Sequence, residues 1–284
     1  MQKQVKSIYG YSSIDNLVPG VRGQRAFPTR AFRESDPFLM LDHIGPEKVG
    51  ANYFLNGEGH DHPHKGFETL SFLLEGTLYH RDSLGNEETL TSGSVQRMNA
   101  GSGIIHGGDM ASDSDTGRFH SVQLWVNNPS NEKNSKPGIH NVTNQEIPFL
   151  LEGGAKLRVI AGTLNGLKGK IKTKATTQIG HLIAEGKSSL EIGTFPNGYT
   201  VMVYVLEGEA EVGNRVLREH QLATLEQEGD SLRISTSKQA QLLILSGAPL
   251  NEPIAFGGPF VMNTQEEIRQ AQVDYELGRF GIIQ

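Results

Sequence analysis

Cysteine is absent from the 284-residue sequence, and its absence excludes several kinds of site. Disulfide bonds, thiolate zinc sites, iron–sulfur clusters and thiol catalysis all need cysteine sulfur. Any metal-binding or catalytic site must therefore be built from other side chains. Histidine, with 10 residues, is the main nitrogen donor that remains.

Long apolar runs are also missing. No stretch of about 18 consecutive apolar residues occurs, which is the length that a membrane-spanning helix requires. Met1–Tyr9 is polar and lacks the apolar core of a secretory signal peptide. We therefore expect a soluble, cytoplasmic protein that does not bind membranes.

The sequence has little positive charge to offer a nucleic acid. It contains 26 Lys and Arg against 32 Asp and Glu, a net charge of −6. Because nucleic-acid binding depends on neutralising phosphates, we expect no direct nucleic-acid binding. A local exception is a series of alternate lysines, Lys168, Lys170, Lys172 and Lys174, which would share one face of a strand. Such lysines usually protect an edge strand, and an anionic partner is the alternative.

Glycine is abundant, with 34 residues, and helical periodicity is nearly absent. This combination is typical of short strands joined by tight turns and predicts an all-β fold. One helix is indicated near the C-terminus. Asn263 and Thr264 suit its N-cap, and Thr264 and Glu267 have the spacing of a capping box. The pattern predicts that this helix continues through Tyr275.

The sequence contains an internal repeat. Gly66–Gly76 (GFETLSFLLEG) and Gly198–Gly208 (GYTVMVYVLEG) both read as apolar strands that end in Leu-Glu-Gly. Farther on, Gly93–Gly101 and Gln221–Gly229 each combine a short strand with a glycine turn. Two copies of one β-domain explain this similarity better than one long domain does.

The junction between the two copies is predicted between Asn128 and Pro148. That stretch has three prolines among Asn, Ser, Gly and Lys, a composition typical of a linker. We therefore divide the chain into an N-terminal domain, residues 1–135, and a C-terminal domain, residues 136–284, which includes the helix.

Three histidines in the first copy have the spacing of a metal site. His62 and His64 are two residues apart in an extended segment, so both imidazoles face the same side. His106 follows Gly101–Gly103, glycines that let the backbone bend before a strand that brings a third imidazole inward. In a jelly roll, the segment with His62 and His64 can lie beside the strand that carries His106, so that the three imidazoles converge. Neutral imidazole binds iron, zinc, copper and nickel. We predict that these three histidines bind one metal ion.

The other histidines carry weaker signals. His60 shares the strand parity of the first pair, but the adjacent glycine leaves its direction open. His80 follows a strand beside Arg81-Asp82, and we expect it to be a cross-strand polar partner or to line a pocket. The remaining five are isolated in the sequence and are expected to be structural or solvated: His43, His120, His140, His181 and His220.

The second copy supports the metal assignment because it lacks every candidate ligand. At the offset of the repeat, the positions of the three histidines hold Thr194, Pro196 and either Arg233 or Ile234. Histidines that served only to build the fold would be expected in both copies. Metal binding is therefore predicted for the first copy alone.

Several segments together resemble the pirin family of proteins with two cupin domains. They are spread over most of the chain: HPHKGFETL from His62, LEG from Leu74, HRDS from His80, QRMNAGSGIIH from Gln96, QLWVN from Gln123 and GPFVMNT from Gly258. The resemblance implies two tandem jelly-roll β-barrels with a short C-terminal helix. It also implies one non-haem iron in the N-terminal barrel, held by His62, His64 and His106.

The fourth ligand of the family does not carry over. The family pattern has a glutamate two residues after the third histidine, and here that position is Gly108. Glu68, which shares strand parity with the paired histidines, is our candidate catalytic residue, although it could instead orient a histidine. Asp109 could reach the metal through a β-bulge. Alternatively, three histidines and water complete the site.

The resemblance implies two different functions. Bacterial pirins include quercetin 2,3-dioxygenases, so we expect an iron(II)-dependent dioxygenase whose small aromatic substrate, a flavonol, chelates the metal in an apolar pocket. Phe54, Phe67, Met98 and Ile104 are candidates to line this pocket, and packing in the core is the favoured alternative for all four. Eukaryotic pirins are redox-sensitive transcriptional co-regulators. The alternative is therefore a non-catalytic iron protein that binds a regulatory protein partner. A third possibility is a structural two-cupin protein that has lost its iron. Histidine ligands alone do not distinguish Fe(II) from Zn, Ni, Cu or Mn.

Overall fold

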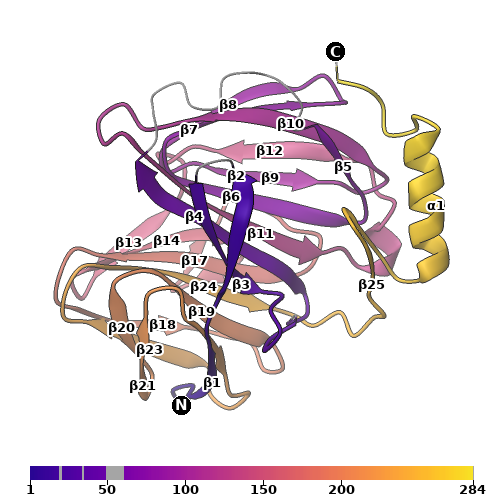
Figure 1. Ribbon diagram of the computed structural model, residues 1–284. Helices are drawn as coiled ribbons and strands as arrows, with labels where there is room; N and C mark the ends of the chain where they lie inside the picture. The colour runs from indigo at the N-terminus through magenta and orange to yellow at the C-terminus, as the bar shows by residue number, and fades with distance from the viewer. Residues whose placement is uncertain (19–20, 34, 49–60, 284) are drawn as a thin grey trace. The chain divides into compact units, whose positions relative to one another are not determined.

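The computed structural model describes residues 1–18, 21–33, 35–48 and 61–283. These residues form β-strands throughout, with one α-helix near the C-terminus, which confirms the predicted all-β fold (Figure 1). Phe54 and His60, which the sequence analysis named, lie outside the described residues. Within the described ranges, no helix has the length and apolar character needed to cross a membrane.

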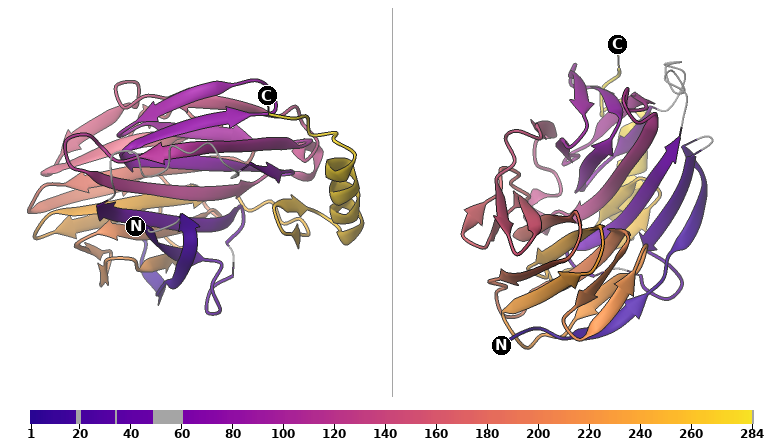
Figure 2. Two further views of the ribbon diagram at one scale, coloured as in Figure 1. Left: turned by 45° about the horizontal axis from the view of Figure 1, so that its top comes forward. Right: turned by 90° about the vertical axis from the view of Figure 1, so that its left-hand side faces the viewer.

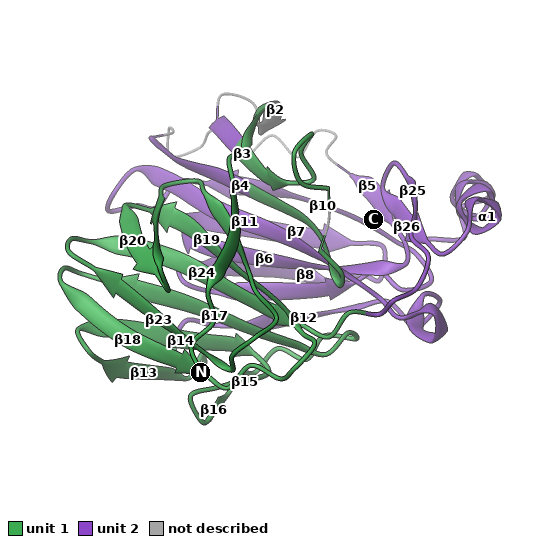
Figure 3. Cartoon of the chain, turned by 90° about the horizontal axis from the view of Figure 1, so that it is seen from below, with its two compact units in different colours: residues 1–14, 24–42, 145–249 green, residues 15–23, 43–144, 250–284 purple. Residues whose placement is uncertain are grey.

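The chain forms two compact units, each made of three segments (Figure 3). Unit 1 contains residues 1–14, 24–42 and 145–249, and unit 2 contains residues 15–23, 43–144 and 250–284. Each unit thus combines the middle of one sequence copy with a terminal segment from the other half of the chain. The division of the chain at residues 135 and 136 stays a prediction.

The strands of unit 1 form two main antiparallel sheets. The larger sheet has the order β1 (Val5–Tyr9), β22 (Leu222–Leu225), β19 (Thr200–Glu207), β24 (Ala240–Gly247), β17 (Thr177–Ala184), β14 (Ala155–Ala161), β13 (Phe149–Glu152). The smaller sheet has the order β18 (Ser188–Gly193), β23 (Ser231–Thr236), β20 (Glu209–Val212), β21 (Arg215–Arg218). Apolar side chains from both sheets form a single core cluster, which includes Leu157, Leu182, Ile192, Val203 and Leu232. Burial of such side chains drives the two sheets together.

Unit 2 repeats this arrangement. Its larger sheet contains, in order, β12 (Gly138–Val142), β9 (Val95–Asn99), β6 (Phe67–Glu75) and β11 (Arg118–Asn127). Its smaller sheet has the order β5 (His62–His64), β10 (Ile104–Ala111), β7 (Thr77–Asp82), β8 (Glu87–Thr91). Three further strands are divided between the two units: β2 (Ser12–Val18), β3 (Val21–Phe27) and β4 (Phe38–Lys48).

The internal repeat is confirmed at the level of sheet topology. The first pair of repeated segments contains β6 and β19, and the second pair contains β9 and β22. The order β9-β6-β11 in unit 2 matches β22-β19-β24 in unit 1, and β5-β10-β7-β8 matches β18-β23-β20-β21. Each unit is therefore one copy of the same two-sheet cupin fold.

The stretch between Asn128 and Pro148, predicted as a linker, contains regular structure. Pro129 precedes a 3-10 helix, η1 (Ser130–Glu132), and β12 then pairs along its whole length with β9. Val142 at the end of β12 is buried, so this strand contributes to unit 2. The composition of this stretch did not reveal β12, because Pro137 and Pro148, which made the stretch resemble a linker, lie on either side of the strand and not within it.

The alternate lysines are exposed or half-buried, and Gly169 and Ile171 between them are buried. Their alternation is as predicted, but only Lys168 belongs to a strand, the short β16 (Leu167–Lys168), which pairs with β15 (Thr163–Leu164).

The C-terminal segment of unit 2 contains a hairpin and the helix. The hairpin pairs β25 (Ala255–Gly257) with β26 (Phe260–Met262), and α1 (Gln265–Glu276) follows and lies beside it (Figure 2). The predicted capping box is confirmed, since the Thr264 hydroxyl accepts from the Glu267 amide and the Glu267 carboxylate accepts from the Thr264 amide. Ile268 and Ala271 are the buried side chains of α1.

Thr264→Ala should destabilise α1 by about 1 kcal/mol, because the first turn loses the acceptor for its free amide. Amide hydrogen exchange along α1 measures this directly, and exchange in the first turn should accelerate about fivefold. Thr264→Ser keeps the acceptor and serves as the control. Equal exchange in the Ala and Ser variants would contradict the capping role.

Candidate metal centre

The structure brings the three predicted histidines together. β5 and β10 are antiparallel neighbours, and His106 stands directly opposite His62 in their ladder. His64 lies two residues farther along β5, on the same face. Each histidine offers one ring nitrogen to a cluster in which all three atoms lie within 4.8 Å of one another.

Two of these imidazoles have a buried ring nitrogen with no hydrogen-bond partner among the described residues, the Nε2 atoms of His64 and His106. A buried polar atom without a partner costs about 1–3 kcal/mol, so such atoms need an explanation. The fit to a metal ion is good, because Nε2 of a neutral imidazole is a common ligand atom and a bound cation would satisfy both atoms at once.

Burial, together with neighbouring histidines, keeps His64 and His106 neutral. Burial, followed by the neighbouring His62, lowers the pKa of His64 to about 3. Burial and the adjacent histidines also hold the pKa of His106 well below its usual range. The lone pairs of both side chains are therefore free of protons at neutral pH.

The tautomer of His64 is fixed by a backbone group. Its Nδ1 lies 3.2 Å from the carbonyl oxygen of Pro259, which can only accept. Nδ1 therefore carries the proton, and Nε2 presents its lone pair to the cluster. Pro259 lies between β25 and β26, almost 200 residues away along the chain, and the sequence analysis had no signal for its role.

Two aromatic side chains flank His64. The ring of Phe67 lies 5.1 Å from the imidazole, centroid to centroid, and the ring of Trp125 lies 5.3 Å from it. Trp125 is half-buried, and its Nε1 donates to Gln123. Phe67 was expected beside the metal, whereas Trp125 was noticed only as part of a motif. Met98 and Ile104 are buried in a small apolar cluster with Ala100.

His80 also lies next to the cluster. Its ring stacks on His106 with a centroid distance of 5.6 Å, and its Nε2 lies 3.0 Å from an Asp82 carboxylate oxygen. Burial raises the pKa of Asp82, but hydrogen bonds from His80, Asn86 and the Leu84 amide outweigh it and hold that pKa below its usual value. His80 is thus a buried polar neighbour of the site, oriented by a carboxylate.

The structure does not bring Glu68 to the histidines. At Gly66 the backbone adopts φ 86°, and the chain passes from β5 to β6, in the other sheet. This turn ends the strand parity on which the expectation for Glu68 depended. Glu68 lies on the face of β6 opposite to Phe67, fully buried, and its carboxylate pairs with Arg97, whose Nε is 2.7 Å away.

Asp109 and Gly108 add no carboxylate either. The ladder between β10 and β7 is continuous from His106 to Ala111, without the bulge that would turn Asp109 inward. Gly108 faces the same side as His106, directly opposite His80. A Cβ atom there would overlap the Tyr79 carbonyl, so this backbone leaves no room for any side chain. Among the described residues, the cluster contains histidines only.

The equivalent pair of strands in unit 1 carries aliphatic side chains. β18 and β23 occupy the sheet positions of β5 and β10, and Leu190 stands opposite Ile234 and Ile192 opposite Leu232. All four side chains are buried in the core cluster of unit 1. The strand equivalent to β5 is therefore β18, which ends just before Thr194. A constant offset between the two sequence copies had instead placed the equivalent of His62 at Thr194.

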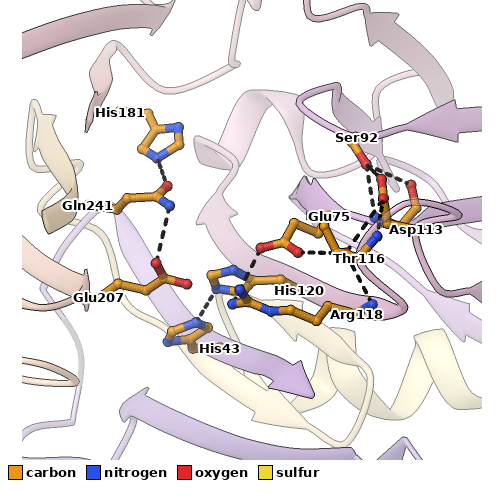
Figure 4. Close-up of polar contacts among 11 residues, drawn as sticks. His43, Glu75, Ser92, Asp113, Thr116, Arg118, His120, His181, Glu207 and Gln241 are labelled. Atoms are coloured by element: carbon orange, nitrogen blue, oxygen red, sulfur yellow. Dashed lines mark hydrogen bonds and ion pairs between the residues drawn. The ribbon is translucent and has the colours of Figure 1, made fainter. Parts of the chain in front are cut away.

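Three of the histidines that are isolated in the sequence have buried polar partners. The Nε2 atoms of His43 and His120 lie 2.6 Å apart in unit 2 (Figure 4). In unit 1, His181 bonds through its two nitrogens to Gln241 and Arg158. These contacts join distant parts of the sequence, and they agree with the expectation that these histidines are structural.

Gly108→Ala should destabilise unit 2 by about 1–3 kcal/mol, because the new methyl group overlaps the Tyr79 backbone. Gly138→Ala is a matched control: it also lies in a strand, and its Cβ would meet no atom within 4 Å. Urea unfolding followed by fluorescence of Trp125, the single tryptophan, reports on this unit. Equal midpoints for the two variants would show that Gly108 is not sterically required.

Comparisons with known proteins agree with this geometry. Family profiles described as "Pirin" and "Pirin C-terminal cupin domain" match residues 20–126 and 179–281. The chain is 36% identical to a Pseudomonas aeruginosa protein named "Putative quercetin 2,3-dioxygenase PA2418", over 98% of each chain. It is 33% identical to human pirin, over 92% of this chain and 89% of the human protein.

Solved structures extend the comparison. A crystal structure of quercetin 2,3-dioxygenase from Acinetobacter baumannii is 32% identical, with a TM-score of 0.89 over all of both chains. The Escherichia coli pirin YhhW in complex with nickel(II) is 19% identical, with a TM-score of 0.63 over 86% of this chain and all of the other, and shares the fold. With both family profiles matched and these relatives covered almost from end to end, the chain belongs to the pirin family of two-cupin proteins.

Proposed function

We propose that the protein binds one divalent metal ion, iron(II), through His62, His64 and His106, and that it acts as a dioxygenase on small aromatic substrates of the quercetin type. The observation that carries the proposal is the pair of buried Nε2 atoms in a three-histidine cluster. The names of similar proteins, among them a quercetin 2,3-dioxygenase with 32% identity, support the reaction class.

The bound metal would supply Lewis acidity and an open coordination position for a chelating substrate. The protein supplies the rest. Neutral imidazoles present lone pairs, and the Pro259 carbonyl holds His64 in the required tautomer. Phe67 and Trp125 provide an apolar wall beside His64, suited to contact with a flat aromatic ring.

A three-histidine site with water in the remaining positions fits the described residues better than a site with a carboxylate ligand. Asp109 faces away from the histidines, and Glu68 is engaged with Arg97 in the other sheet. We therefore assign Glu68 a supporting role, in which its ion pair fixes β6 against β9. The missing carboxylate at Gly108 favours a second candidate function, a non-catalytic iron protein that binds a regulatory partner.

Metal analysis tests the site itself. Untagged protein should carry about one iron per chain by mass spectrometry, and the double variant His62→Ala/His106→Ala should carry almost none, because removing two of three ligands leaves a single imidazole. Chelation should lower the melting temperature of the wild type only. Absence of metal from the wild type, even after anaerobic loading with iron(II), would overturn the proposal.

Oxygen consumption with quercetin tests the reaction. His106→Ala should reduce the rate by more than about 100-fold, since losing even a supporting partner of a metal ligand costs 10–100-fold. His140→Ala, an exposed histidine on β12, is the matched control and should retain the wild-type rate. Metal binding without oxygen consumption in the wild type would favour the regulatory function.

A further inference from the structure

We propose that the C-terminal arm, residues 255–281, positions the metal-site histidines, and that Lys133 and Asp274 are the positioning residues through which it acts. The inference rests on the proposed metal site. The arm comprises β25, β26, α1 and the turn that follows, and it belongs to unit 2 together with all three histidines.

The arm contacts the strand that carries His62 and His64. The Val261 amide donates to the Lys65 carbonyl at 3.0 Å, and Lys65 and Phe260 form a parallel bridge. The Pro259 carbonyl accepts from His64 in the same stretch. β5 has only three residues, and among the described strands its ladder partner in its sheet is β10 alone. The short strand β5 is therefore held on one side by β10 and elsewhere by its contacts with the arm.

Lys133 joins the arm to this strand from the inside. Its side chain is buried, with 1% of its surface exposed. Its ammonium group donates to the carbonyls of Gly66 and Val261, both at 2.9 Å, and to the side-chain oxygen of Asn127 at 2.5 Å. An ammonium group has three donors, and all three are used. One side chain thus connects the turn that follows β5, the end of β11 and β26.

Asp274 on α1 makes the corresponding contact nearer the surface. Its carboxylate lies 3.1 Å from the Lys65 ammonium, and both side chains are largely buried, with 13% and 8% exposed. It also accepts from Gln270 and Arg279. Charge-assisted hydrogen bonds of this kind define geometry more strictly than neutral ones. Lys65 is adjacent to His64, so this contact ties α1 to a ligand-bearing segment.

The same arm contacts the strand that carries His106. The Phe280 carbonyl accepts from the Ser83 hydroxyl at 2.5 Å, and that hydroxyl accepts from the Ile105 amide at 3.1 Å. Ile105 packs against the apolar cluster of the arm, which includes Phe260 and Phe280. Both strands of the metal site are therefore attached to one element. Metal sites need such supporting contacts, because small displacements of a ligand weaken binding.

A cobalt(II) titration tests the inference, since the visible spectrum of Co²⁺ reports coordination geometry as well as affinity. Lys133→Met and Asp274→Asn should each weaken Co²⁺ binding by about 10–100-fold and change the absorption band, because the histidines lose their relative placement. Glu266→Gln is the matched control. It breaks an exposed ion pair with Arg269 on the same helix and should change neither quantity.

The outcomes separate the two proposals. If the wild type binds no Co²⁺, the metal site itself fails, and the role of the arm fails with it. If the wild type binds Co²⁺ and Asp274→Asn binds it with unchanged affinity and spectrum, only the role of the arm is overturned, even if this variant unfolds more readily in urea. Should Lys133→Met fail to fold, Asp274→Asn decides the question, because its position near the surface makes it the milder change.

Discussion

The pairing of β5 with β10 is the contact on which the proposed metal site depends. It places His106 opposite His62, with His64 on the same face, so that three ring nitrogens gather within 4.8 Å. Bringing these nitrogens together has an energetic cost, because the Nε2 atoms of His64 and His106 are buried without a hydrogen-bond partner among the described residues. A bound cation would supply a partner to both atoms.

Unit 1 shows the same fold without this constraint. Its equivalent strand pair, β18 with β23, carries Leu190, Ile192, Leu232 and Ile234, which pack into an apolar core. Stability of the fold therefore does not require histidines at this place. In unit 2, histidines occupy the positions that aliphatic side chains fill in unit 1. Functional sites commonly arise in this way, by replacing a few side chains on an otherwise unchanged fold.

Among the described residues no carboxylate joins the three histidines, and the backbone at Gly108 accounts for this at one position. Gly108 lies so close to the Tyr79 backbone that a side chain at this position would overlap the Tyr79 carbonyl. His80 stands opposite Gly108 and stacks on His106. The third histidine therefore has as its neighbour an imidazole that Asp82 holds in place.

Local patterns in the sequence determined the all-β fold, the capping box at Thr264 and the shared face of His62 and His64, because turn glycines, strand parity and capping depend on residues close in the chain. The spacing and the resemblance predicted His106 as the third histidine, but only the pairing of β10 with β5 brings it to the other two. Strand parity predicted that Glu68 faces the same side as His62 and His64. The backbone turns at Gly66, which has a positive φ, and the next strand, β6, belongs to another sheet, so Glu68 does not lie beside them. The contacts of Pro259, Lys133 and Asp274 lie beyond such reasoning. They join residues tens to hundreds of positions apart, and only the tertiary structure decides which of these meet.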